Sequence, residues 1–325
     1  MNRDVLLLLA LPASGKSEIR RYLDHADAAT RAGLGIGAPV HVDDYPYVHI
    51  MRRAAEELVS AGEPPAFFAS PMEPFIDARD WSTLTLLLDE DARCVLGTAP
   101  APSESARALF ARIDRARSAA GPGPAFAPLP TPVVDALALR LQPEASRVYS
   151  SLTAARSAWR PGATTLLVEF ARGGPEGAEL PLEAPLGYRH ALSLLSPAVL
   201  ERAAVLYVLV TPEESRRRNA ERTRPGRDGD ASILYHGVPE SVMRADYGCD
   251  DMGLLLEAAT TPNTIEVVAG AEVARLPAAV LDNRDDLTSH LRGEPEDWDR
   301  GAAEELHRRL GAALGTVGFP VQRTR

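Results

Sequence analysis

The sequence contains almost no lysine and very little cysteine. Lys16 is the one lysine among 35 basic residues, so arginine supplies every other basic side chain. Cys94 and Cys249 are the two cysteines, and their separation fits neither a disulfide framework nor a metal site, which predicts free thiols in a reducing cytoplasm. Apolar runs of about 18 residues or more are also missing, which predicts that no helix spans a membrane.

The rest of the composition is that of a folded, acidic protein. Hydrophobic residues make up 45% of the 325 residues, enough for a sizeable core, and the net charge is -10. This charge disfavours a nucleic acid or an anionic membrane as the main partner. The apolar run near the N-terminus is interpreted as a strand rather than a signal peptide. Asp4 directly precedes the run, and Gly15-Lys16-Ser17 stands where a cleavage site would be expected.

A strand, a short loop and a helix follow one another at the start of the chain. Val5–Leu9 is an unbroken apolar run, as in a parallel strand covered on both faces. Gly15-Lys16-Ser17 matches the end of a P-loop motif, and an apolar pattern of helical spacing begins at Ile19. The order of strand, loop and helix is the context that this motif requires.

The residue types of the loop suit phosphate and magnesium binding. Backbone N–H groups of Ala13, Ser14 and Gly15 and of the helix N-terminus are expected to form an anion site. Lys16 can then reach the β- and γ-phosphates of ATP, and the Ser17 hydroxyl can hold Mg²⁺. A compact ammonium on a flexible stem cannot be replaced by the planar fork of arginine, which fits the position of the lone lysine.

An ordinary strand, turn and helix with a chance Gly-Lys-Ser is the alternative. The strict motif has glycine at the position that Ala10 occupies here. Alanine is the mildest replacement for that glycine, and the strand and helix on either side favour the P-loop interpretation.

A short second strand is predicted at Val40–Val42, and it ends in Asp43 and Asp44. Ligands of open α/β sheets bind beyond the carboxyl ends of the strands, so both carboxylates are expected near the phosphates. Side chains alternate along a strand, so one of the two is expected to face the reaction. The alternative is that the pair caps the following helix.

At these residues the chain resembles the P-loop small-molecule kinases, a broad group that holds the shikimate, gluconate and nucleoside kinases and the zeta-toxin-like enzymes. In this group a carboxylate at the end of the second strand takes the proton of the acceptor hydroxyl, which implies that role for Asp43 or Asp44. The group builds its acceptor site or lid from an insertion between the second and third strands, here the helical region 47–160. Candidate acceptor contacts are Tyr45, Tyr47, Arg52, Arg53, Arg79 and Trp81. The alternative is that these aromatics are core residues and these arginines a solvated face.

The next buried strand, Thr164–Phe170, stands where a Walker B strand belongs. Glu169 near its end is a candidate magnesium ligand, and Arg172 is a candidate phosphate contact. The pair resembles the Glu-Arg pairing after the third strand of deoxynucleoside kinases, although the spacing differs and Glu replaces the usual Asp. Glu169 as a hydrogen-bond acceptor at a buried edge is the alternative.

A helix rich in arginine follows the fourth strand, Ala203–Val210. Thr211 is predicted to cap it, with Glu214 completing a capping box. Arg218 and Arg222 lie four apart on one helix face, and the helix resembles the lid of nucleotide and small-molecule kinases. These two arginines are expected to stabilise the charge of the transferring phosphoryl group, within a lid and following loop at 211–251. The alternative is a solvated helix of paired charges.

The last third of the chain carries fewer signals. Two more strands are predicted at 264–268 and 278–283, and a helix at Asp285. The turn at Asn283 resembles the last strand and helix of dephospho-coenzyme A and guanylate kinases, which implies a place beside the adenine. The segment 232–251 is expected to be irregular, and its further candidates are Tyr235, His236, Asp250 and Asp251.

Together these patterns predict one α/β domain with a doubly wound, mainly parallel sheet, a P-loop NTPase of kinase type with a helical insert between strands 2 and 3. The expected activity is ATP- and Mg²⁺-dependent phosphorylation of a small hydroxyl-bearing acceptor, such as a nucleoside or a sugar-like metabolite. A nucleoside-monophosphate kinase and a regulatory nucleotide-binding module remain the two alternatives. The sequence leaves the acceptor, the nucleotide preference and the oligomeric state open.

Overall fold

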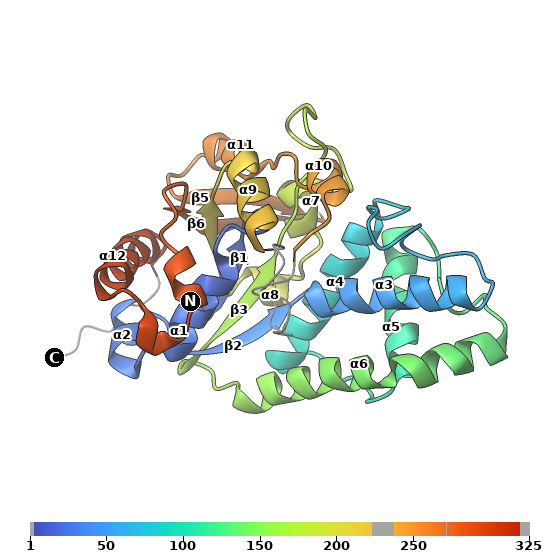
Figure 1. Cartoon of the computed structure of the whole chain (residues 1–325). Helices are drawn as coiled ribbons and strands as arrows, with labels where there is room; N and C mark the ends of the chain where they lie inside the picture. The colour runs from blue at the N-terminus through green and yellow to red at the C-terminus, as the bar shows by residue number, and fades with distance from the viewer. Residues whose placement is uncertain (1–2, 223–236, 271, 319–325) are drawn as a thin grey trace.

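One sheet forms the centre of the molecule. The computed structural model describes residues 3–222, 237–270 and 272–318. Within these ranges six strands lie in the order β2-β3-β1-β4-β6-β5 (Figure 1). Neighbouring strands are parallel, except that β5 pairs antiparallel with β6 at the edge. The strands are β1 Val5–Leu9, β2 Ala38–Asp43, β3 Thr164–Phe170, β4 Ala203–Leu209, β5 Thr264–Ala269 and β6 Glu272–Asp282.

Helices cover both faces of this sheet. Along β1 the side chains of Leu6 and Leu8 point to one face and those of Val5, Leu7 and Leu9 to the other, and all are buried. The first face packs against α1 (Lys16–His25) and α12 (Arg300–Thr316). The second packs against α7 (Gly187–Ser193), α8 (Pro197–Leu200) and α11 (Met252–Ala258). The protein is therefore α/β, in an arrangement compatible with a doubly wound fold.

Four helices lie between β2 and β3, where the sequence predicts the helical insert. They are α3 Tyr45–Ser60, α4 Asp80–Val95, α5 Ala106–Ala120 and α6 Thr131–Ala158. Figure 1 shows them beside the carboxyl ends of β2 and β3, with α6 running along the outside. They share a second core, which also receives Val242 and Met243 from α10 (Glu240–Asp246). The insert thus packs against the sheet domain through a segment that follows β4.

Several sequence-based expectations are wrong in detail. The described part of 232–251 is not irregular, since it contains α10. The helix predicted at Asp285 is absent from the described residues, where the short 3₁₀ turns η2 (Ser289–Arg292) and η3 (Pro295–Asp297) lie between β6 and α12. Asp286 has a φ of 57°, a left-handed conformation that a helix start cannot contain.

The helix α2 (Ala28–Gly33) was not indicated by the glycine- and alanine-rich sequence around it. Asp27 caps it by accepting a hydrogen bond of 2.7 Å from the Thr30 backbone N–H. Both cysteines are free, as the sequence predicts. Among the described residues, no helix has the length and apolarity needed to cross a membrane.

Asp114 closes the loop after α5, and its replacement tests the packing of the insert. Its buried carboxylate accepts backbone hydrogen bonds from Ala125 (2.7 Å), Phe126 (3.0 Å) and Ala127 (2.8 Å). Asp114→Ala leaves these three N–H groups, of which that of Phe126 is buried, without their acceptor, so we expect the free energy of unfolding to fall by about 2–3 kcal/mol, measured by urea denaturation. The exposed Asp297→Ala should change it by less than about 0.5 kcal/mol, and equal effects would contradict this role of Asp114.

Candidate functional site

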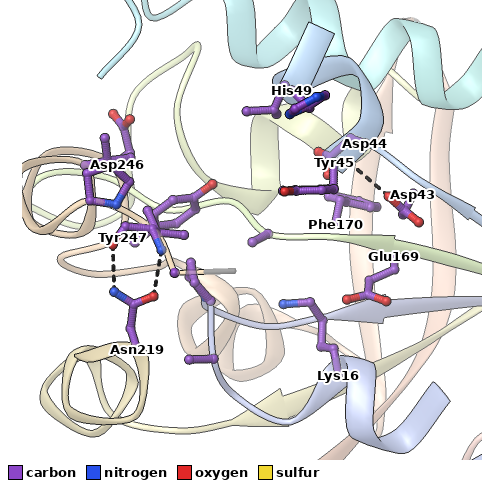
Figure 2. A pocket seen from close by; sticks show the side chains of 18 of the residues that line it. Lys16, Asp43, Asp44, Tyr45, His49, Glu169, Phe170, Asn219, Asp246 and Tyr247 are labelled. Carbon is purple, nitrogen blue, oxygen red and sulfur yellow. Dashed lines mark hydrogen bonds between the residues drawn. The ribbon is translucent and has the colours of Figure 1, made fainter. Parts of the chain in front are cut away.

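The carboxyl ends of β1, β2 and β3 meet at one cavity of about 350 Å³. The loop between β1 and α1 forms its floor, and the insert and α10 form its far side (Figure 2). Ligands of open α/β sheets bind at this edge. This cavity is therefore the candidate functional site.

The β1–α1 loop has a backbone that only particular residues allow. Ala13 (φ 54°) and Gly15 (φ 104°) adopt left-handed conformations. A Cβ on Gly15 would overlap Thr288 Oγ1 and lie 2.7 Å from Asn283 Nδ2, so glycine is required both by conformation and by space. Gly15 is also the N-cap of α1, where no side chain caps the helix. The N-terminal N–H groups of α1 thus face the cavity without a side-chain acceptor.

Asn283 holds this loop in place. Its Nδ2 donates to Ser14 O at 2.7 Å and to Thr288 Oγ1 at 3.0 Å, and its Oδ1 accepts from the Leu287 backbone N–H at 2.6 Å. The side chain is fully buried and does not line the cavity. The sequence-based expectation is a place for Asn283 beside the adenine, and the structure shows its side chain bound to the β1–α1 loop outside the cavity lining.

Lys16 lies at the floor of the cavity. Its Nζ donates to the carbonyl oxygens of Ala10 (2.9 Å) and Leu11 (3.1 Å), and the residue is buried. Burial lowers the pKa of Lys16 to about 8, although the nearby charge of Glu169 opposes this effect. The ammonium is therefore poised to gain from a negatively charged ligand.

Four polar side chains from three elements meet beside Lys16. Ser17 Oγ donates to Glu169 Oε1 at 3.4 Å, and Arg20 Nη1 lies 3.3 Å both from Glu169 Oε2 and from Asp43 Oδ2. Asp43 also accepts from the Tyr45 backbone N–H at 3.1 Å. Burial raises the pKa of Asp43 to about 6, against the opposing charge of Arg20. Sequence reasoning predicts Ser17, Glu169 and Asp43 at one site but overlooks Arg20, which looks like a surface charge on α1.

Asp44 and Arg172 form a pair directed toward the insert. Arg172 Nη1 donates to Asp44 Oδ2 at 2.6 Å, and Nη2 donates to Thr85 Oγ1 at 2.9 Å. The guanidinium is 2% exposed and lies 5.1 Å from the ring centre of Trp81. The sequence predicts a phosphate contact for Arg172, and such a contact would require these bonds to break. Asp44 is thus engaged in supporting the insert.

The two predicted phosphate arginines on α9 (Pro212–Arg222) differ in their surroundings. Arg218 is 1% exposed, donates to Glu214 Oε1 at 2.6 Å and to Asn283 O at 2.7 Å, and does not line the cavity. Arg222 lines the cavity and donates to the fully buried Glu18 at 2.8 Å. Both are buried, so the alternative of a solvated face does not describe them.

The predicted cap of α9 is present in part. Thr211 Oγ1 accepts from the Glu214 backbone N–H at 3.1 Å. The Glu214 side chain does not complete the predicted capping box, because its Oε1 is bound by Arg217 and Arg218 at 2.6 Å each. Charge-assisted bonds to two arginines are stronger than the return bond of a capping box.

Among the candidate acceptor contacts, Tyr45, Arg52 and Trp81 line the cavity. The other three face away: Tyr47 donates to Asp91 at 2.5 Å, Arg53 binds Glu56 and Glu57, and Arg79 binds Asp77. Asp250 accepts from Tyr207 and Asp251 caps α7, both outside the cavity lining. Tyr235 and His236 lie outside the described residues.

Sequence reasoning does not single out Phe68, Phe75, Asp246 or Tyr247, which also line the cavity. They come from the insert and from the C-terminal end of α10, where Tyr247 follows the helix, and no motif joins them. The described residues contain no cluster of three or more His, Cys, Asp or Glu side chains that could hold a metal ion. Comparison of the chain with protein-family models, with curated proteins and with solved structures finds no match.

Replacing the adjacent aspartates should separate two kinds of effect on stability. Because the pKa of Asp43 is raised from 3.8 to about 6, its ionisation lowers the stability of the folded state as the pH rises through this window. Asp43→Asn should therefore leave the melting temperature at about pH 7.5 unchanged or higher. Asp44→Asn weakens the bond to the buried Arg172 and should cost about 1–3 kcal/mol. Thermal and urea unfolding measure the stability of both variants. A greater loss of stability in Asp43→Asn than in Asp44→Asn would contradict this assignment.

Proposed function

We propose that this protein is a P-loop kinase that transfers the γ-phosphoryl group of ATP to a hydroxyl group of a small acceptor. The observation that carries the proposal is the convergence of Lys16, Ser17, Glu169 and Asp43 at the carboxyl edge of β1, β2 and β3, beside the uncapped N-terminus of α1. Each residue type is one that phosphoryl transfer requires, and each lies in the same cavity.

The loop and Lys16 are proposed to bind the phosphates of ATP. Free backbone N–H groups and the helix dipole favour an anion at the start of α1. The hydroxyl of Ser14 is buried and has no hydrogen-bond partner among the described residues, as expected of a loop that receives its ligand there. On binding, the Lys16 ammonium would exchange its carbonyl contacts for phosphate oxygens.

Ser17 and Glu169 fit a nucleotide-bound Mg²⁺. Magnesium keeps several waters and needs only one or two protein ligands besides the phosphates, so a larger cluster is not required. A hydroxyl and a carboxylate 3.4 Å apart at the loop are a suitable oxygen donor set. When bound, the ion neutralises charge on the β- and γ-phosphates.

Asp43 is proposed as the general base. Its carboxylate takes the proton of the acceptor hydroxyl while the acceptor oxygen forms a bond to the γ-phosphorus and the bond from that phosphorus to the ADP oxygen breaks. A pKa of about 6 keeps Asp43 ionised at neutral pH and closer to the operating pH than an ordinary aspartate. Arg222, which lines the cavity, is proposed to stabilise the transferring group once it leaves Glu18.

A hydroxyl acceptor is favoured over a nucleoside monophosphate. A phosphate acceptor needs arginines at its end of the cavity. Among the described lining residues that end carries Arg52, whose Nη1 donates to Pro71 O at 2.5 Å and whose guanidinium lies 4.0 Å from the Phe68 ring centre. The Nη1 donor and the face of Arg52 are thus already engaged.

Proton uptake tests the role of Lys16. Near its pKa of about 8, half of the lysine lacks a proton, and phosphate binding restores it, so nucleotide binding at that pH should take up about half a proton. Calorimetric titration of a non-hydrolysable ATP analogue with Mg²⁺, in two buffers of different ionisation enthalpy, measures this uptake. Lys16→Met should abolish it and weaken binding. The same uptake in both proteins would end the P-loop assignment.

The rate of phosphoryl transfer tests Asp43. Asp43→Asn should lower kcat by roughly 10² to 10⁴ with little change in nucleotide affinity. In the wild-type protein kcat should fall as the pH drops below about 6, because Asp43 becomes protonated. Transfer from labelled ATP to a library of hydroxyl metabolites supplies the assay, and Asp44→Asn is the matched control. Wild-type rates in both variants would exclude this base, and acceptor-independent hydrolysis would favour a regulatory module.

A further inference from the structure

The far end of the cavity has aromatic walls. Phe75 contacts the edge of Trp81 with ring centres 5.0 Å apart, and Trp81 contacts Tyr247 at 5.5 Å. Phe68 stacks on Phe75 at 4.3 Å. Phe75, Trp81 and Tyr247 are nine-tenths or more buried yet line the cavity, so they shape it rather than the outer surface. Aromatic walls of this kind favour a ligand with a planar ring.

Asp246 adds one polar group to these walls. Figure 2 shows it with Tyr247 on the side of the cavity opposite Asp43 and Glu169. It is 7% exposed, and its Oδ2 is buried without a hydrogen-bond partner among the described residues. Burial raises the pKa of Asp246 to about 6, against the Trp81 hydrogen bond and the Arg52 charge, so the side chain is ionised at neutral pH. A buried, ionised oxygen with no donor is costly unless a ligand supplies one.

The charges nearby restrict that ligand. The carboxylate of Asp246 opposes an anionic group at this end of the cavity, and those of Asp43, Asp44 and Glu169 also line the cavity. A cationic acceptor would meet the Arg52 guanidinium, whose charge acts on Asp246. A neutral N–H or O–H donor satisfies Asp246 without either conflict.

Given the kinase function proposed above, we propose that the acceptor is a neutral molecule with a planar ring, as in a nucleoside. The ring packs against Phe75, Trp81 and Tyr247, and an N–H or O–H group on it donates to Asp246 Oδ2. The reacting hydroxyl lies at the other end of the molecule, toward Asp43. Asp246 is thus a specificity-determining residue on α10, separated in sequence from the phosphate loop by most of the chain.

Binding of defined probes tests this inference. The probes are cytidine, uridine, adenosine and pyridoxine, which are neutral planar-ring compounds with ring donors, and ribose, which has hydroxyls but no planar ring. Each is titrated calorimetrically into the full-length protein saturated with Mg²⁺ and a non-hydrolysable ATP analogue. We expect at least one planar-ring probe to bind, and to bind more tightly than ribose.

Two variants then assign the contacts. Asp246→Asn keeps the shape of the side chain but presents an amide N–H to the ligand donor, so affinity for that probe should fall roughly 10- to 100-fold. Phe75→Leu keeps the wall apolar but removes an aromatic ring, and should weaken the same probe roughly 3- to 10-fold. The exposed Asp297→Asn makes the same change in net charge and should leave affinity unchanged. If Asp246→Asn does not fold, Phe75→Leu still decides the outcome.

The outcomes separate this inference from the proposed function. If the ATP analogue binds but none of the planar-ring probes does, or if Asp246→Asn and Phe75→Leu bind their probe as tightly as the wild-type protein, the inference is overturned and the phosphate site stands. Tighter binding of ribose than of every planar-ring probe would overturn it as well. If the ATP analogue itself does not bind, the proposed function fails and the inference fails with it.

Discussion

The bridge that Arg20 forms between Asp43 and Glu169 is the contact on which the candidate site depends. Parallel pairing of β2 and β3 sets these two carboxylates directly opposite each other. Like charges in that position repel, and burial at the sheet edge strengthens the repulsion. Arg20, which lies 3.3 Å from an oxygen of each, compensates both charges from the first turns of α1. Without Arg20, two like charges would lie opposite each other at this edge of the sheet with no partner from α1.

The same arrangement gives Asp43 and Glu169 the different surroundings that the proposed base and the proposed metal ligand need. Glu169 is turned toward Ser17, at the loop, while Asp43 is turned toward the insert by the Tyr45 backbone N–H. A nucleotide with Mg²⁺ would add positive charge beside Glu169 and negative charge beside Lys16. Burial has already shifted the pKa values of Lys16 and Asp43, which lie close to these added charges, so ligand binding and proton binding are expected to be coupled at this site.

Sequence patterns are sufficient where the structure is set by neighbours along the chain. Val5–Leu9 and Thr164–Phe170 are strands with the predicted bounds, because a continuous apolar run between turns needs only burial on both faces. Thr211 caps α9 because the hydroxyl and the N–H that it binds are three residues apart. The strand, loop and helix around Gly15 are predicted correctly for the same reason, since the pattern that indicates them is local.

Features made by distant segments could not be predicted in this way. Arg172 and Arg218 are predicted as phosphate contacts, yet tertiary packing buries Arg172 against Asp44 and Arg218 against Asn283. The aromatic wall joins Trp81 from the insert to Tyr247 beyond β4, and no sequence pattern links these two residues. The turn after Asn283 fails as a helix because Asp286 is left-handed there, a consequence of the contacts that Asn283 makes with Ser14 and Leu287.

A crystal structure with Mn²⁺ and a non-hydrolysable ATP analogue tests the central claim most directly. Mn²⁺ replaces Mg²⁺ in oxygen sites and is located by its anomalous scattering. The proposed kinase site predicts one metal peak about 2.0–2.3 Å from Ser17 Oγ, on the side that faces Glu169. The γ-phosphate should then contact Lys16 and face the part of the cavity that Asp43 lines. A nucleotide bound elsewhere, or a metal peak away from Ser17 and Glu169, would contradict the claim.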